Sequence, residues 1–238
     1  MTTPTARWAL YFAPAPDSVW WSAGSAWLGH CADTGENKRQ PAIPGVSSEA
    51  QAQLTATPAR YGWHATLKAP FELAIGVSET QLAHRLSGFA ASQRAFTLPR
   101  LRVQRMGDVL ALMPESADPR LQALADACVT QMHDLAAPLS VSELARRRAS
   151  GLSARQEDLL QAWGYPHVLE QFQFHFSLTG SLWGQPEATC RAMEQAARDW
   201  FYPLPPCRFD AVSLFVEPAR HQPMRRVGRW ALPTDQDT

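Results

Sequence analysis

The chain has 238 residues, and its 22 lysines and arginines balance 22 aspartates and glutamates, which gives a pI near 7.1. This length suffices for one large domain or two small lobes with an apolar core. A neutral balance excludes the broad positive field of a general nucleic-acid binder, although a local basic cleft is compatible with it. The four cysteines show no C-x-x-C spacing, which is typical of reduced thiols in a cytoplasmic protein. We expect neither a signal peptide nor a membrane segment.

The first sixty residues predict a strand, a helix and then an irregular segment. Residues 7–13 predict a strand that ends where two prolines follow. Asp17 or Ser18 is placed to cap the next helix, which contains three tryptophans. Residues 33–60 are polar and predict a loop with one short helix at 48–55.

Two similar tetrads are the most informative feature of the chain, His64-Ala65-Thr66-Leu67 and His175-Phe176-Ser177-Leu178. Each lies in an apolar, strand-like run. Because successive side chains of a strand alternate between its faces, the histidine and the hydroxyl residue two positions later project from the same side. Two such strands facing each other would place two imidazoles and two hydroxyls around one small anion.

The tetrads also begin two copies of one series of elements, at about 61–113 and 172–232. In each copy a helix follows the tetrad. The first helix begins at the capping-box pattern Ser78-x-x-Gln81, and the second begins at Pro186, a favoured first position. The strands after these helices are expected at about 96–104 and 108–113, and at about 208–216 and 224–232. Strand–helix–strand–strand therefore occurs twice, which indicates an internal repeat.

Helical segments separate the two copies. Capping-box patterns begin at Ser140 and Ser153 and predict two helices, the second ending near Gly164. We therefore expect a helical hairpin at about 140–166, inserted between the copies. No flexible linker composition occurs there, so we interpret residues 1–238 as one two-lobed domain.

The paired motifs suit the hydrolysis of a cyclic phosphodiester. Such a reaction needs a base that deprotonates water and an acid that protonates the leaving alkoxide, and histidine suits both tasks near neutral pH. We predict His64 and His175 as this pair, without assigning the two roles. Thr66 and Ser177 would donate to the phosphoryl oxygens. The remaining histidines lack partners at metal-ligand spacing, so we predict no metal site.

The two tetrads resemble the paired H-x-T/S motifs of the 2H phosphoesterase superfamily, which includes RNA 2′,3′-cyclic phosphodiesterases and 2′–5′ RNA ligase-like proteins. More narrowly, the chain resembles the DUF1045 family, which is associated with phosphonate metabolism, over nearly its whole length. This resemblance depends on four blocks, at residues 61–71, 143–148, 163–166 and 174–180. The two histidines are 111 positions apart, a spacing that the inserted hairpin accounts for. Trp63 stands where the pattern leads us to expect Phe.

The resemblance implies an α+β fold. Two pseudo-symmetric lobes of antiparallel sheet, each backed by helices, would surround a central cleft that both motifs face. It also implies metal-independent catalysis with no cofactor. The link to phosphonate breakdown suggests a phosphorylated ribose cyclic phosphate as the substrate.

Other side chains are weaker candidates for substrate binding. Lys68 and Thr179 each follow their histidine by four residues and could share its strand face, although a position outside the cleft is equally compatible with the pattern. Tyr11 could reach the cleft with its hydroxyl, or pack in the core. The remaining candidates belong to the inserted hairpin, where a solvated helix face and a turn anchor are the simpler interpretations, and they are Arg146, Arg147, Arg148 and Tyr165.

The sequence thus predicts a cytoplasmic, monomeric hydrolase that acts on a small phosphorylated substrate. An RNA-end 2′,3′-cyclic phosphodiesterase is the alternative within the same fold, and RNA is the less favoured partner because the chain is neutral. A non-catalytic nucleotide-binding module is the alternative of a different class. Both His and hydroxyl pairs are intact, which favours catalysis.

Overall fold

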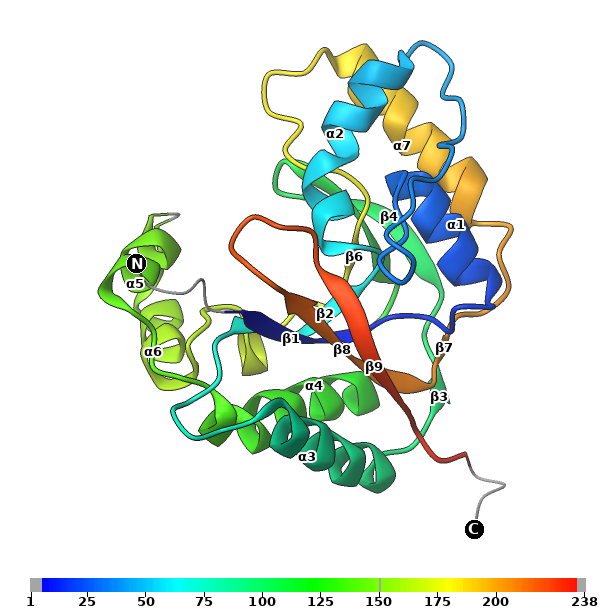
Figure 1. The fold of residues 1–238 in the computed structure, drawn as a ribbon. Helices are drawn as coiled ribbons and strands as arrows, with labels where there is room; N and C mark the ends of the chain where they lie inside the picture. Colours follow the sequence, from blue (N-terminus) through cyan, green and yellow to red (C-terminus); the bar gives the residue numbers. More distant parts are fainter. Residues whose placement is uncertain (1–5, 150, 235–238) are drawn as a thin grey trace.

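The computed structural model describes residues 6–149 and 151–234 (Figure 1). Its strands are β1 (Arg7–Phe12), β2 (Ala65–Phe71), β3 (Phe96–Thr97), β4 (Leu101–Met106), β5 (Val109–Pro114), β6 (Phe176–Ser177), β7 (Arg208–Phe209), β8 (Ala211–Glu217) and β9 (Arg225–Ala231). Its α-helices are α1 (Val19–Leu28), α2 (Ser48–Tyr61), α3 (Glu79–Ser92), α4 (Pro119–Gln131), α5 (Val141–Arg148), α6 (Ala154–Trp163) and α7 (Glu187–Phe201).

The fold is α+β, with a seven-stranded antiparallel sheet in the order β4-β5-β6-β2-β1-β8-β9. β3 and β7 form a separate two-stranded ladder. We expected the two sets of strands to lie in two lobes, and they join into one continuous sheet. The junction is the pairing of β2 with β6, the strands that contain the two motifs.

The internal repeat is present as a series of elements: β2, α3, β4 and β5 in the first copy, and β6, α7, β8 and β9 in the second. The hairpins are exchanged between the copies. β5 of the first copy pairs with β6 of the second, whereas β8 of the second copy pairs with β1, which in turn pairs with β2. The expected strand at 96–104 is divided into β3 and β4, because only Phe96–Thr97 pairs with β7.

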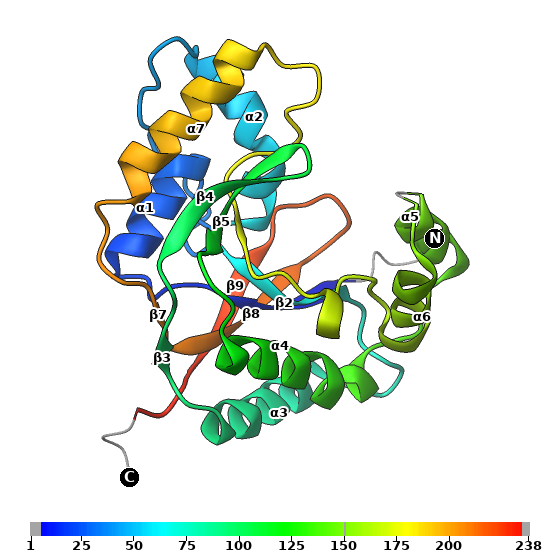
Figure 2. The same cartoon turned by 180° about the vertical axis from the view of Figure 1, so that it is seen from behind.

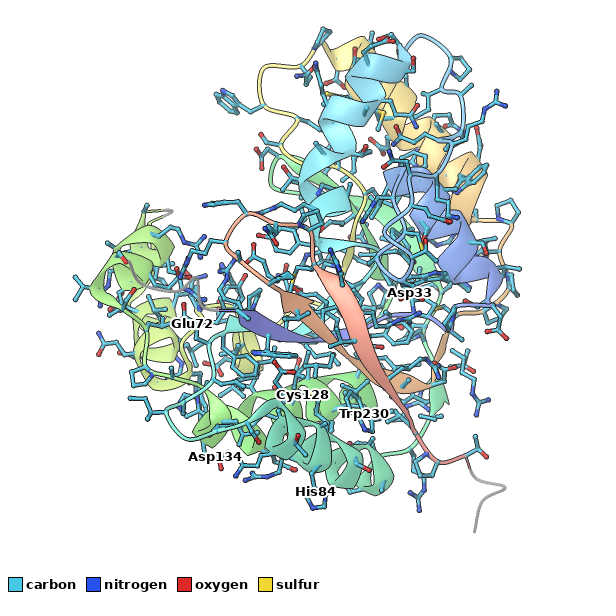
Figure 3. All side chains as sticks on the ribbon, in the orientation of Figure 1. Asp33, Glu72, His84, Cys128, Asp134 and Trp230 are labelled. Carbon is cyan, nitrogen blue, oxygen red and sulfur yellow. The ribbon has the colours of Figure 1, made fainter. Side chains whose placement is uncertain are left out.

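Helices cover the sheet in two groups (Figures 1 and 2). α3 and α4 lie along β2, β8 and β9, whereas α1, α2 and α7 lie at the end of the molecule near β4. The α5–α6 hairpin stands apart beside the N-terminal end of β1. Cys128 lies between α4 and the sheet, and His84 points outward from α3 (Figure 3). In the part of the chain that is described, no helix combines the length and apolarity needed to traverse a lipid bilayer.

Helix capping largely follows the predicted signals. Ser78 and Ser153 form complete capping boxes, and Ser18 rather than Asp17 caps α1. Ser140 forms only half of the expected box, because the carboxylate of Glu143 pairs with arginines instead of returning to the cap. Pro186 is the N-cap of α7 and not its first residue.

α2 is longer than the predicted helix at 48–55, since it continues to Tyr61 with Pro58 inside it. Proline has no N–H, so it cannot bond the carbonyl four residues earlier. That carbonyl belongs to Leu54, and it accepts the N–H of Gly180 at 2.7 Å. The proline therefore frees an acceptor that ties α2 to the segment after the second motif.

Aromatic packing fixes the loop before the first motif. The ring of Trp63 is fully buried and stacks on Phe176 at 4.7 Å and on Phe201 at 5.3 Å between centroids. Gly24 of α1 allows this close packing, because a Cβ there would lie 2.0 Å from Trp63 Cδ2. The residue just before His64 is thus locked into the core between both copies of the repeat.

Candidate active site

The pairing of β2 with β6 brings the two motifs together. Ala65 lies opposite Phe176, and both side chains are buried in the core. Continuing this antiparallel register by one residue places His64 opposite Ser177 and Thr66 opposite His175. Because side chains alternate along strands, these four project from the other face of the sheet. Diagonal neighbours on adjacent antiparallel strands lie about 7–8 Å apart, which sets the scale of the separation of the histidines.

His64 is oriented by the backbone just before it. Its Nδ1 lies 2.8 Å from the carbonyl oxygen of Gly62, which can only accept, so Nδ1 bears the proton. Nε2 of the neutral ring is then the unprotonated nitrogen, and it accepts from the Thr66 hydroxyl at 3.3 Å. Gly62 has a φ of +78°, a conformation that favours glycine. The turn thereby directs a basic nitrogen toward the open face of the sheet.

His175 uses the same arrangement in the second copy. Its Nδ1 lies 2.8 Å from the carbonyl oxygen of Gln173, also two residues earlier. Its Nε2 is therefore the other nitrogen available for proton transfer. The repeat thus extends from the order of elements down to the hydrogen bond that holds each imidazole.

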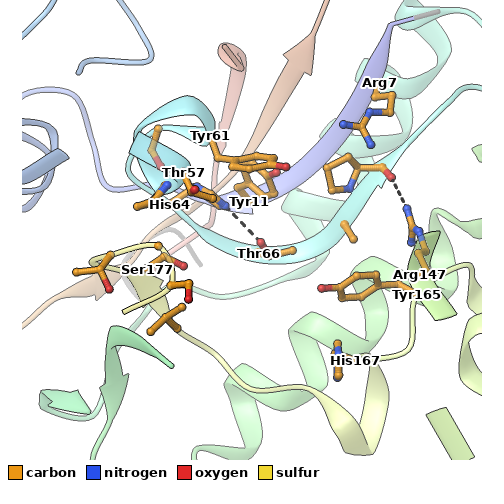
Figure 4. Close-up of a pocket in the computed structure, with 18 of the residues that line it drawn as sticks. Arg7, Tyr11, Thr57, Tyr61, His64, Thr66, Arg147, Tyr165, His167 and Ser177 are labelled. Atoms are coloured by element: carbon orange, nitrogen blue, oxygen red, sulfur yellow. Dashed lines mark hydrogen bonds between the residues drawn. The ribbon is translucent and has the colours of Figure 1, made fainter. Parts of the chain in front are cut away.

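A pocket of about 470 Å³ opens over His64 (Figure 4). Both hydroxyl residues of the motifs, Thr66 and Ser177, line it together with His64. His175 lines an adjoining cavity of about 510 Å³, which shares Thr66, Ala69, Tyr165 and His167 with the first. The combined hollow has the size of a small-molecule site.

Burial lowers the pKa values of both histidines. The pKa of His64 falls to about 4, chiefly because its ring is removed from water; the Gly62 carbonyl opposes this shift and His175 adds to it. The pKa of His175 is lowered for the same main reason, with a smaller contribution from His167. A bound phosphate anion would raise both values toward neutrality.

The Tyr11 hydroxyl is not offered to the cleft as a substrate ligand. The ring of Tyr11 stacks on His64 with centroids 3.8 Å apart, and its hydroxyl donates to Met224 Sδ at 3.2 Å. The phenol is 1% exposed, and burial raises its pKa well above the ordinary value. Tyr11 lines the pocket as a platform under His64.

Lys68 lies outside the pocket of His64. It is 5% exposed and points toward α4, where Nζ approaches the Val129 carbonyl oxygen at 3.4 Å. It lines another adjoining cavity, between α4 and the inserted hairpin, whose wall shares Ala69, Pro70, Arg147 and Tyr165 with the pocket of His64. Burial lowers its pKa to about 8. This position does not favour the predicted role in binding phosphate beside His64, because β2 is irregular near this residue and its side chain turns to the helical side.

Thr179 does line the pocket, yet its hydroxyl is already used. Its Oγ1 accepts the N–H of Leu110 at 3.0 Å, and the residue is 2% exposed. The side chain therefore holds β5 beside the segment that follows the second motif. The predicted role as a substrate donor is not favoured by this geometry.

The three arginines of the inserted hairpin have different positions. Arg146 and Arg147 line the pocket, as does Tyr165. Arg148 does not: it pairs with Glu157 inside the hairpin, because its position at the end of α5 turns it toward α6. The sequence pattern could not separate these three neighbours.

Sequence reasoning missed several residues of the pocket. Arg7, Thr57, Tyr61 and His167 all line it. Thr57 comes from the predicted loop and Tyr61 from the predicted start of the first repeat copy, and both belong to the end of α2. The rings of Tyr165 and His167 pack edge to face, with their centroids 5.6 Å apart. No spacing in the sequence links Arg7 or His167 to the motifs.

The chain belongs to the family described as "Protein of unknown function (DUF1045)", whose model matches residues 66–225. It is 43% identical over 195 residues to a protein of Janthinobacterium sp. (strain Marseille) named ribose 1,5-bisphosphate phosphokinase PhnN, covering 82% of this chain and 43% of the relative. A protein of the same name from Laribacter hongkongensis is 38% identical over 214 residues, covering 89% of this chain and 48% of the relative. The chain thus spans less than half the length of these curated relatives.

Similar solved structures include E. coli LigT in apo form, with 15% identity and a TM-score of 0.45 over 97% of this chain and 99% of that one. A second, described as a phosphoesterase, has 16% identity and a TM-score of 0.43 over 97% and 99% of the two chains. At these values the likeness adds nothing to the strand pairing and side-chain geometry described above.

Proposed function

We propose that this protein is a phosphodiesterase that hydrolyses a small cyclic phosphodiester by two-histidine acid–base catalysis. The supporting observation is the antiparallel pairing of the two His-x-Thr/Ser motifs on neighbouring strands, which gathers two imidazoles and two hydroxyls on one face. Each imidazole is held through Nδ1 by a backbone carbonyl, so Nε2 is the nitrogen that would transfer the proton in each.

His64 is the base in this proposal. Its pKa of about 4 keeps it neutral near pH 7, and its Nε2 has a lone pair on the pocket side. It accepts a proton from water as the water oxygen forms a bond to phosphorus. His175, in its protonated form, gives a proton to the ester oxygen as the P–O bond of the ring breaks. The two proton transfers belong to one coupled pair, so the rate profile against pH reports on both groups together.

Thr66 and Ser177 are proposed to stabilise the phosphoryl oxygens. Each hydroxyl lies opposite the histidine of the other motif, so each can donate while the facing imidazole handles a proton. Hydroxyl donors directed at the developing negative charge lower the barrier because they are held in place before the reaction. The Thr66 hydroxyl would exchange its bond to His64 for one to the substrate.

The names of the curated relatives suggest the substrate. The present chain contains no glycine-rich phosphate loop, so we assign the kinase activity in those names to the part of the relatives that this chain does not cover. A 1,2-cyclic phosphate of ribose 5-phosphate, opened at the bond between phosphorus and O2, yields ribose 1,5-bisphosphate. We propose that this hydrolysis supplies the compound that the relatives are named for.

An assay of cyclic phosphates in EDTA tests the function. The wild-type protein should open the 1,2-cyclic phosphate of ribose 5-phosphate, and phosphorus NMR should show ribose 1,5-bisphosphate as the product. Preferential opening of RNA 2′,3′-cyclic ends would favour the RNA-end enzyme instead. Absence of turnover with every cyclic phosphate, combined with tight nucleotide binding, would replace catalysis by the binding-module alternative.

We also propose a cytoplasmic location. All four cysteines, Cys31, Cys128, Cys190 and Cys207, are buried and unpaired. Free thiols of this kind are typical of reducing compartments.

A further inference from the structure

The pocket above His64 continues into a basic region formed by other parts of the chain. Arg7 of β1 and Arg146 of the inserted hairpin line this region, and both belong to the same pocket as His64, Thr66 and Ser177. Figure 4 shows Arg7 and Arg147 on the opposite side of the pocket from Ser177. A substrate that fills the pocket would therefore contact the motifs at one end and guanidinium groups at the other.

Arg7 is held rigidly and keeps one nitrogen available. Its Nε donates to Glu217 at 2.6 Å and its Nη2 pairs with the same carboxylate, while the side chain is 9% exposed. Glu217 is itself 1% exposed and also accepts the N–H of His221. Nη1 of Arg7 has no partner among residues 6–149 and 151–234. A nearly buried guanidinium with an unused N–H group at a pocket wall is a preformed anion donor.

Arg146 and Arg147 differ in how firmly they are engaged. Arg147 donates to Glu143, to the carbonyl oxygens of Gly164 and Pro70, and lies over the Tyr165 ring, so it anchors the hairpin to β2. Arg146 pairs only with Glu143 in the described part of the chain, and 60% of its side chain is exposed. Arg146 is thus free to reorient toward a ligand, whereas Arg147 supports the wall.

The charges of this region do not cancel. The ion pairs that surround the basic end of the pocket join five arginines to three carboxylates; the arginines are Arg7, Arg60, Arg146, Arg147 and Arg220, and the carboxylates are Glu72, Glu143 and Glu217. Two positive charges remain. A phosphate monoester bears close to two negative charges at neutral pH and accepts the forked N–H groups of arginine.

We propose that Arg7 and Arg146 form a second anion subsite, which binds the phosphate monoester of the substrate while its cyclic phosphodiester lies at the two histidines. This inference rests on the proposed function and specifies its substrate class: a small sugar with one cyclic and one terminal phosphate. The subsite selects such a sugar over a cyclic phosphate that lacks the second anion.

The test compares two substrates and two variants. The substrates are the 1,2-cyclic phosphates of ribose with and without the 5-phosphate, and the readout is the ratio of their kcat/KM values. Losing one charge-assisted, forked interaction should reduce this ratio by about 10- to 100-fold in Arg146→Gln. Arg155→Gln is the matched control, because Arg155 is another exposed arginine of the hairpin, pairs with Glu170 and does not line the pocket. It should keep the wild-type ratio.

Binding of ribose 5-phosphate, measured by calorimetry, separates the subsite from the reaction. The wild type should bind it and Arg146→Gln should bind it about 10-fold or more weakly. Arg7→Lys, which keeps the charge beside Glu217 but loses the fork, should also weaken binding. If the wild type opens cyclic phosphates but Arg146→Gln keeps the wild-type ratio and affinity, the subsite is wrong and the proposed function stands. If no cyclic phosphate is opened but binding of ribose 5-phosphate depends on Arg146, the proposed function is wrong and the anion subsite stands.

Discussion

The two halves of the candidate site share one backbone hydrogen bond to the histidine but differ in the side chains around it. In both, a carbonyl two residues before the histidine accepts from Nδ1. On the neighbouring strand, however, Tyr11 lies opposite Thr66, whereas Ala111 lies opposite Ser177 at the equivalent place of the second copy. The phenol ring covers His64, whereas no aromatic ring among residues 6–149 and 151–234 stacks on His175, which has the methyl group of Ala111 at the equivalent place.

In the proposed mechanism, this difference would give the two histidines of a duplicated unit separate tasks. The repeated hydrogen bond fixes the same nitrogen for chemistry in each copy. The non-repeated neighbour then sets how strongly each ring is removed from water, and so where its pKa lies. In the proposed mechanism, a base and an acid would arise from identical motifs whose rings are both buried, because Tyr11 stacks on His64 alone of the two in the described part of the chain.

The largest expected effect is on turnover. His64→Ala and His175→Ala should each lower kcat by about 10²- to 10⁴-fold, the usual contribution of a general acid or base. Initial rates with the cyclic phosphate substrate measure this loss.

His84→Ala is the control for these two variants, because His84 is exposed on α3 and lines neither the pocket of His64 nor the cavity of His175. It should retain the wild-type rate. Thermal melting separates catalysis from folding: unfolding of either motif variant under assay conditions would mean that the histidines are structural.

Acid should destabilise the protein mainly through His64. Its pKa is about 4 when folded and near 6.5 when unfolded, so the unfolded chain binds a proton first as the pH falls. Folding stability should therefore decrease between pH 6.5 and 4, by up to about 3 kcal/mol. Urea titrations at several pH values measure this slope.

His64→Gln should remove most of that slope, and His175→Gln should remove less of it. Proton NMR titration gives the sharper comparison: His64 should titrate below His175, and Tyr11→Leu should raise the pKa of His64 toward that of His175. Equal pKa values in the wild type would contradict the role assigned to Tyr11.

Gly62 and Gln173, whose carbonyl groups hold the two imidazoles, should differ in how well they tolerate substitution. Gly62→Ala places a side chain at a φ of +78°, and its Cβ would lie 2.5 Å from Ala32 Cβ. We expect a loss of about 1–3 kcal/mol in the free energy of unfolding, together with reduced kcat. Gln173→Ala removes an exposed side chain and should change stability by less than about 0.5 kcal/mol. Chemical denaturation of both variants tests this contrast.

The last predictions concern Lys68 and Thr179, the residues four positions after each histidine. Lys68→Met removes a buried ammonium group and should stabilise the protein at pH 7 by on the order of 1–3 kcal/mol. The gain should shrink from pH 8 to 10.5, because the folded lysine loses its proton first. Thr179→Val leaves the Leu110 N–H without its acceptor and should cost about 1–2 kcal/mol. Denaturation curves at pH 7 and 10 distinguish the two cases.

Local signals in the sequence predicted much of the fold. Alternation predicted β1, the serine caps predicted α3 and α6, and the recurrence of strand–helix–strand–strand predicted the repeat. The two motifs were recognisable because strand periodicity alone places His and Thr or Ser on one face. Their pairing on neighbouring strands of one sheet was not predicted, because we expected the two motifs to face a cleft from separate lobes.

Long-range contacts account for what the sequence could not predict. The ion pair of Arg7 with Glu217 joins residues 210 positions apart, and no spacing indicates it. Arg147 lines the pocket and Arg148 pairs with Glu157, and this difference depends on where α5 packs against the rest of the protein. The helical continuation to Tyr61 depends on Gly180, which satisfies the carbonyl that Pro58 leaves free. In each case tertiary structure overrides the local pattern.

The exchange of hairpins between the copies has a consequence for the integrity of the molecule. The β4–β5 hairpin continues the sheet beyond the strand of the second motif, and the β8–β9 hairpin continues it beyond β1 and β2. Severing the chain within the α5–α6 insertion would leave two fragments that cannot complete their own hydrogen-bonded edges. Each fragment would need the strands of the other to complete its sheet. The candidate active site would form only where β2 of one fragment pairs with β6 of the other.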